Sequence, residues 1–67
     1  MHSNFKIMRR PEVEAVTGLS RSSIYAKMKN DGFPTAIKLS ERSVGWLAHE
    51  VQYWLENRVA ATREGGM

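Results

Sequence analysis

The 67 residues make one domain at most, and a chain this short buries only about 60% of the surface that its unfolded form exposes, so the core is small. The absence of cysteine excludes a disulfide framework and a thiolate metal site. Ten Lys and Arg against seven Asp and Glu give a formal charge of +3, a modest excess that solubility alone explains as well as an acidic partner does. No apolar run approaches the roughly 20 residues that cross a bilayer, and MHSNFKIMRR lacks the apolar region of a signal peptide, so we expect a cytoplasmic protein without membrane contact.

The first predicted helix is short. Pro11 suits the first position of a helix, where its missing amide proton costs nothing. Val13 and Val16 form an apolar edge, and Gly18 can adopt the positive φ that ends a helix. We therefore expect a helix from Pro11 to about Thr17.

A second helix follows after a short turn. Ser20 is a candidate N-cap, and Ile24 and Met28 lie four residues apart on one face. Asn30, Asp31 and Gly32 stop this helix, and Phe33-Pro34 forces an extended exit. Two short helices joined by a glycine-containing turn are typical of a helix-turn-helix.

The hydrophobic period then changes. Apolar residues alternate with polar or small ones around Ile37 and again around Trp46. This pattern predicts a β-hairpin with strands near 36–39 and 43–46. A lone hairpin is marginally stable in water, so its apolar face must pack on the helices.

The last helix is expected over about residues 48–61. Val51, Trp54, Leu55 and Val59 lie along one side, and Arg58 can lie at the edge of this stripe with its charge outside. The largest core candidates in the chain are Phe33, Trp46 and Trp54.

The domain prediction has three parts. Residues 1–8 are an N-terminal arm, partly disordered; residues 9–61 are the folded domain; residues 62–67, which include two glycines, are a frayed tail.

The outer face of the second helix carries small and basic residues. Ser22, Ser23 and Ala26 lie opposite Ile24 together with Lys29, so the helix surface is low enough to approach a major groove while Lys29 reaches a phosphate. Arg21 is the residue of this helix that can contact guanine with two hydrogen bonds. Lys27 and Tyr25 lie on the two flanks.

Two interpretations of this face compete. The serines can be ordinary first-turn helix residues and the lysines solvated, and Tyr25 can be a core residue or a phosphate donor. The order of helix, turn, serine-rich helix and hairpin favours DNA binding, because Lys38 and Arg42 near the hairpin tip supply a second basic surface.

A resemblance supports this interpretation. The segments RRPEV, TGLSRSSIYAKM, FP, IKL, SVGWL and EVQYWLENRVAA cover most of residues 9 to 61. In this order and at these spacings, the sequence resembles the AlpA family of small phage and prophage regulatory proteins, which are related to MerR-like winged helix-turn-helix domains and to phage excisionases. The resemblance implies a mainly α fold with a small β-hairpin, of the winged helix-turn-helix type.

The resemblance also implies a site and a function. The second helix would enter the major groove of double-stranded DNA, and the hairpin would act as the wing. The residues expected to contact DNA are Arg10, Arg21, Ser22, Ser23, Tyr25, Lys27, Lys29, Lys38 and Arg42. The chain departs from the family pattern at Ser40-Glu41, where a glycine is usual in the wing turn, and at His49, where a serine usually starts the last helix.

The same residues also bear on other classes of function. Two histidines and no obvious carboxylate pair argue against an enzyme, and we expect no cofactor, metal ion or small-molecule ligand. A protein-interaction module, with the last helix docking on a partner, is the alternative from another class. Among DNA-binding roles, a transcription regulator is favoured over an excisionase-like factor that bends attachment-site DNA. The protein partners expected for these roles are further copies of the chain on DNA, an integrase or RNA polymerase.

Overall fold

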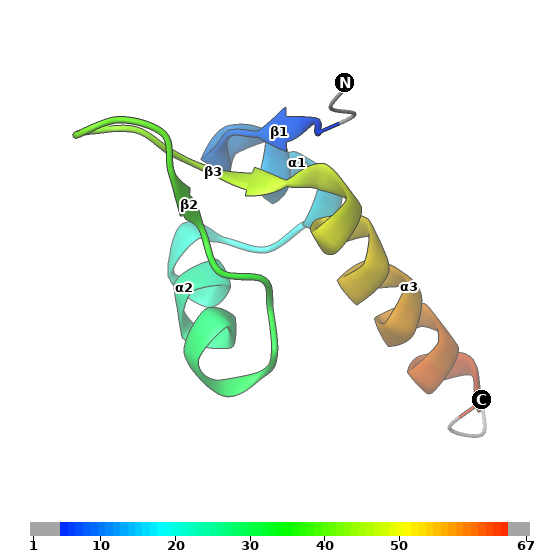
Figure 1. Cartoon of the computed structure of the whole chain (residues 1–67). Coiled ribbons are helices and arrows are strands. Elements are labelled where there is room, and N and C mark those ends of the chain that lie inside the picture. Colours follow the sequence, from blue (N-terminus) through cyan, green and yellow to red (C-terminus); the bar gives the residue numbers. More distant parts are fainter. Residues whose placement is uncertain (1–4, 65–67) are drawn as a thin grey trace.

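The computed structural model describes residues 5–64. Its elements follow in the order β1 (Ile7–Met8), α1 (Arg10–Thr17), α2 (Arg21–Asn30), β2 (Ile37–Lys38), β3 (Val44–Leu47) and α3 (Ala48–Glu64). Figure 1 shows α1 and α2 on one side of a small sheet and α3 running away from it. The predicted fold class is confirmed, since three helices and a strand hairpin make a mainly α domain.

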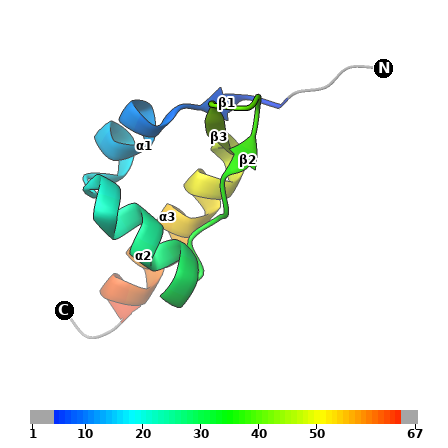
Figure 2. The same ribbon diagram turned by 90° about the vertical axis from the view of Figure 1, so that its left-hand side faces the viewer.

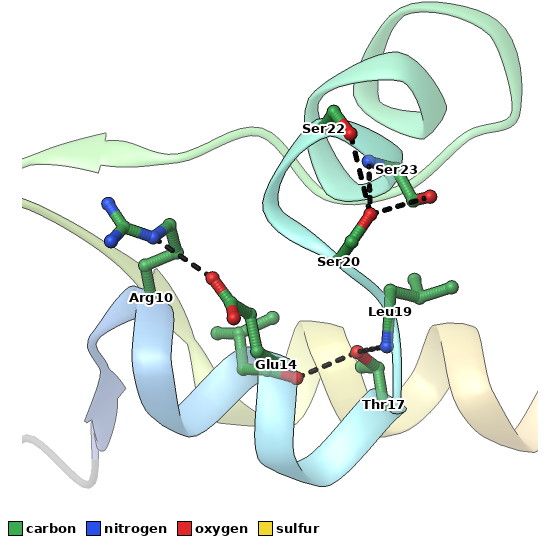
Figure 3. A network of polar contacts seen from close by, with 8 residues as sticks. Arg10, Glu14, Thr17, Leu19, Ser20, Ser22 and Ser23 are labelled. Carbon is green, nitrogen blue, oxygen red and sulfur yellow. Dashed lines mark hydrogen bonds and ion pairs between the residues drawn. The ribbon is translucent and has the colours of Figure 1, made fainter.

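The turn between α1 and α2 is built from local hydrogen bonds. Gly18 has a φ of 76°, and its amide donates to the Glu14 carbonyl at 2.8 Å. The Thr17 hydroxyl donates to the Val13 carbonyl at 2.7 Å and accepts from the Leu19 amide at 3.1 Å (Figure 3). These bonds satisfy backbone groups that the end of a helix leaves free, so α1 stops where the sequence predicts.

Both ends of α2 also follow the prediction. The Ser20 side chain caps the helix by accepting from the Ser23 amide at 3.2 Å. At the other end, the amides of Asp31 and Phe33 both donate to the Lys27 carbonyl, at 2.9 and 3.1 Å. Gly32 takes a φ of 72° between them, which turns the chain so that Phe33 enters the core.

The sheet has one strand more than the hairpin. Its strand order is β1-β3-β2, with Met8 opposite Trp46 on one side and Lys38 opposite Val44 on the other, all antiparallel. Residues 7 and 8 form a strand of this sheet, although the domain prediction places them in the N-terminal arm. β3 has backbone groups that need hydrogen-bond partners on both of its edges, and the short strand β1 supplies partners on one of them. Residues 1–4 lie outside the described part of the chain.

Gly45 lies at the centre of this sheet. A Cβ atom added there would lie 2.5 Å from Ile7 Cγ2, 3.1 Å from Leu39 Cδ1 and 3.1 Å from the Met8 carbonyl oxygen. The missing side chain thus allows β1 and the hairpin to approach β3 closely.

The core joins all three helices to the sheet. Its buried members are large or branched apolar residues: Met8, Val13, Ile24, Phe33, Trp46 and Val51. The Trp46 indole donates its N–H to the Pro34 carbonyl at 3.1 Å, so its polar atom is satisfied inside the core.

Two valines predicted to be apolar contacts lie at the surface instead. Val16 is 47% exposed and Val59 is 46% exposed. α1 is short and packs on the sheet and α2 through the side that holds Val13, which leaves Val16 on its flank. The C-terminal part of α3 runs away from the sheet (Figure 1), and Val59 belongs to residues 56–64, all of which are exposed.

α3 is longer than predicted. It continues to Glu64, so residues 62–64 are helical rather than frayed; neither glycine nor proline interrupts residues 48–64. Residues 65–67 of the predicted tail lie outside the described range. The helix starts directly after β3, and the Ala48 amide donates to the Lys6 carbonyl at 2.8 Å, so one of the free amides of the first turn is satisfied by the backbone beside β1.

Candidate nucleic-acid interface

α2 and the β2–β3 hairpin face the same side of the molecule. In Figure 2 that side faces the viewer: α2 crosses in front of α3, and the hairpin stands beside it. The hairpin tip projects beyond the body of the domain in Figure 1. A projecting hairpin beside the second helix of a helix-turn-helix is the arrangement called a wing, and residues 37–47 are called the wing below.

One flank of α2 is exposed, basic and free of large side chains. Arg21, Ser22, Ala26 and Lys29 are exposed there. Neither Arg21 nor Lys29 forms an ion pair or side-chain hydrogen bond with another residue in the described range. This flank can therefore approach a ligand closely with two unneutralised charges.

Tyr25 lies at the edge of this flank nearest the sheet. Its ring meets the Trp46 ring edge-on, with centroids 6.2 Å apart, while the side chain remains 37% exposed. Both uses weighed for Tyr25 are thus compatible with its position, because the ring packs on the core and part of the side chain remains open to solvent.

Ser23 and Lys27 lie on the other flank and are half-buried. Ser23 belongs to the cap of the helix: the Ser20 hydroxyl donates to the Ser23 hydroxyl at 3.0 Å and lies 3.4 Å from the Ser22 hydroxyl (Figure 3). Lys27 pairs with Asp31 at 3.4 Å. These two predicted site residues are engaged within the protein, in contrast to Arg21 and Lys29.

Asp31 ties the end of α2 to α3. Its carboxylate pairs with Arg58, whose guanidinium carbon lies 4.7 Å from the centre of the Trp54 ring, and the Trp54 N–H donates to the Asp31 carbonyl at 3.2 Å. The hydrogen bond from Arg58 holds the pKa of the Asp31 carboxyl below its ordinary value of 3.8; desolvation opposes this, and the charge of Arg58 and the contact with Lys27 lower the pKa further. The Arg58 side chain therefore lies at the edge of the apolar stripe with its guanidinium at the surface, as predicted.

Arg10 is partly neutralised. Its Nε lies 3.1 Å from a Glu14 carboxylate oxygen, one helical turn along α1. In Figure 3 the guanidinium lies on the side of α1 that faces α2. Arg10 is therefore near the candidate interface, with a carboxylate beside it.

The wing carries its charges at an exposed tip. Lys38, Glu41 and Arg42 are exposed, and both cations lack an ion-pair partner within residues 5–64. The turn closes without the glycine that is usual in the family, since the Leu39 amide donates to the Ser43 carbonyl at 2.7 Å and Ser40 and Ser43 exchange bonds of 3.2 and 3.4 Å. Ser40-Glu41 thus preserves the hairpin, and Glu41 remains an acidic residue at its tip.

Arg9 is missing from the predicted site although it lies beside it. Its Nε donates to the Val44 carbonyl at 3.1 Å, which joins the start of α1 to the root of the wing. In the sequence Arg10 has a carboxylate one helical turn away at Glu14, whereas Arg9 has no carboxylate at that spacing. The contact of Arg9 with Val44 forms only in the folded sheet, so local spacing does not predict it.

The rest of the described surface can be searched for a metal site, a membrane-spanning helix and a pocket. Within residues 5–64 no group of three or more His, Cys, Asp or Glu is placed to hold a metal ion, and no helix is both long and apolar enough to span a bilayer. An open hollow of about 380 Å³ lies beside α3, lined by Gly32, Pro34, Thr35, His49, Glu50, Tyr53, Trp54 and Asn57.

The fold and the interface define a small winged helix-turn-helix protein. The family model described as "Prophage CP4-57 regulatory protein (AlpA)" matches residues 6–59. The chain belongs to this family of prophage regulatory proteins, as the sequence motifs predict.

Two relatives are similar over most of the chain. "Uncharacterized protein ORF88" of Enterobacteria phage P4 is 38% identical over 60 residues, which are 90% of this chain and 68% of the phage protein. The "DNA-binding transcriptional activator AlpA" of Escherichia coli strain K12 is 34% identical in an alignment of 62 positions that covers 84% of this chain and 89% of that protein.

Proposed function

We propose that this chain is a sequence-specific regulator that binds double-stranded DNA, with α2 in the major groove and the wing on the adjacent backbone. The observation that carries the proposal is the shared orientation of two exposed basic surfaces. α2, which carries the exposed residues Arg21 and Lys29, and the wing, which carries the exposed residues Lys38 and Arg42, lie on one side of the molecule (Figure 2). None of these four cations forms an ion pair with another described residue.

The distribution of charge supports this orientation. Residues 21–44 hold five Lys and Arg against two Asp and Glu, a net charge of +3, whereas α3 holds two against three, a net charge of −1. A phosphate backbone is therefore attracted to α2 and the wing and not to the exposed end of α3.

The residues of the interface have different roles in this proposal. Arg21, in the first turn of α2, reads a guanine through two hydrogen bonds, while Ser22 and Ala26 let the helix approach the bases. Lys29, Lys38 and Arg42 bind phosphates and set the orientation. Tyr25 donates a further hydrogen bond to the backbone from the edge of the interface.

Selection of bound duplexes from a random pool, followed by footprinting of the winning sequence, tests sequence-specific binding. A defined site protected on one face of the duplex supports the proposal. A pool that stays random after several rounds, or no binding to any duplex at low salt, refutes it.

The salt dependence tests the electrostatic part. The phosphate contacts of Lys29, Lys38 and Arg42 predict that log K falls with log salt with a slope of about −2.7 or steeper. Fluorescence anisotropy of a labelled duplex at four salt concentrations measures this slope. Binding that is independent of salt would favour the alternative of a protein-interaction module, for which Tyr53 and Val59 on the exposed face of α3 are the apolar candidates.

A role in transcription is favoured over recombination because of the Escherichia coli relative, whose name describes a transcriptional activator. One small module buries only about 600–1,000 Å² on DNA, so we expect several copies to bind together. Protection of a promoter with a changed reporter signal supports regulation. Protection of an attachment site with bending of its DNA would instead assign the excisionase-like role, and RNA polymerase or an integrase would be the corresponding partner.

A further inference from the structure

The wing has an unpaired position at its root. β1 ends at Met8, opposite Trp46, whereas β3 begins two residues closer to the wing tip, at Val44. Carbonyl groups of successive strand residues point to opposite edges. The Ser43 carbonyl accepts from Leu39 on the β2 side, so the Val44 carbonyl points to the β1 side, where the chain has already turned into α1.

The Arg9 side chain supplies the missing hydrogen bond. Its Nε donates to the Val44 carbonyl at 3.1 Å, where the second residue after Met8 would have paired if β1 had continued. The contact joins residues 35 positions apart in the chain and connects the start of α1 to the base of the wing. Arg9 thereby links the two parts of the candidate DNA interface.

The rest of the Arg9 guanidinium remains available. The side chain is exposed, and its two terminal nitrogens have no ion pair or hydrogen bond with any residue that the structure describes. Arg10 differs in this respect, because Glu14 neutralises it. A guanidinium anchored through Nε presents its terminal N–H groups in a fixed orientation, which suits a phosphate oxygen.

We propose that Arg9 both positions the wing and binds a DNA phosphate between α1 and the wing. Nε fixes the wing to the helix-turn-helix, and the terminal nitrogens contact the phosphate. The phosphate contact rests on the proposed function, whereas the positioning role concerns the free protein and is testable without DNA.

Three variants of the full chain separate these roles. Arg9→Gln removes the charge and the anchored fork, and Arg9→Lys keeps the charge but loses the fork. Lys6→Gln is the matched control, because Lys6 is an exposed cation on the same segment without a side-chain partner in residues 5–64.

Hydrogen exchange of the free proteins tests the positioning role. Both Arg9 variants should exchange the amides of residues 38–45 about fivefold or more faster than the wild type, with those of α2 unchanged. Lys6→Gln should leave all of them unchanged. Wing exchange at the wild-type rate in both Arg9 variants would overturn the positioning role.

Anisotropy titrations with the selected duplex test the phosphate contact. Arg9→Gln should bind about tenfold more weakly, with the salt slope reduced by about 0.9. Arg9→Lys should keep the wild-type slope, and Lys6→Gln should keep both affinity and slope. An Arg9→Gln slope equal to that of Lys6→Gln overturns the contact, whereas a wild-type chain that binds no duplex refutes the proposed function itself.

Discussion

Replacing Gly45 by alanine tests the close approach of three strands on which the wing depends. The new Cβ would lie 2.5 Å from Ile7 Cγ2 and 3.1 Å from the Met8 carbonyl oxygen, so either β1 or the wing must shift. Overpacking of this kind costs about 1–3 kcal/mol. Because 1 kcal/mol shifts the Tm of a domain of this size by about 4–8 °C, we expect Tm to fall by roughly 4–24 °C in thermal unfolding followed by circular dichroism.

A second substitution identifies the contact responsible. Ile7→Ala removes the nearest atom, so Gly45→Ala should be less destabilising in that background than in the wild type, by about 1 kcal/mol in a double-mutant cycle. A Gly45→Ala protein that melts within about 2 °C of the wild type would refute the packing argument. Additive effects of the two substitutions would show that Ile7 is not the obstructing residue.

Three further predictions concern α2 and its ends. Arg21→Ala should weaken binding to the selected site more than binding to random DNA. Lys29→Ala should weaken binding to both DNAs alike and reduce the salt slope by about 0.9. Equal losses on both DNAs for both variants would contradict these roles. Asp31→Asn should lower Tm at pH 7. The lowered pKa of Asp31 stabilises the fold fully above the unfolded value of 3.8, and this stabilisation is lost as the pH falls through the folded-state pKa, so the Tm difference from the wild type should shrink there. A constant difference would contradict the ion pairs. Ser20→Ala should cost about 1 kcal/mol and Ser20→Asn little, because Asn also caps; equal stability of all three proteins in urea unfolding would show that the cap is unimportant.

Local sequence signals predicted the helix-turn-helix well. Ser20 and Gly32 mark the limits of α2 through interactions within a few residues, and Ile24 is buried as the spacing indicates. The limits of such signals appear at Val16, which shares an apolar edge with Val13 in the sequence but lies outside the contact that buries Val13. The spacing of apolar residues predicts which side of a short helix faces the core, but it does not predict how far along that side the neighbouring elements reach.

Long-range contacts account for the features that the sequence did not reveal. β1 is two residues long and forms only because Trp46 and Leu47 lie beside it, so it is too short to show an alternation of apolar and polar residues that would predict a strand. Asp31 pairs with Lys27 one helical turn before it, as the spacing allows, but it is also held by Arg58, which lies 27 residues away in the chain. The contact between Arg9 and Val44 likewise depends on the folded sheet.

The central claim is that α2 and the wing form one DNA-binding surface. A titration of the 15N-labelled chain with the selected duplex, followed by amide chemical shifts, tests it most directly. We expect the largest shift changes in residues 21–29 and 38–44 and small ones in residues 53–64. Shift changes concentrated in residues 53–64, with α2 and the wing unchanged, would contradict the claim.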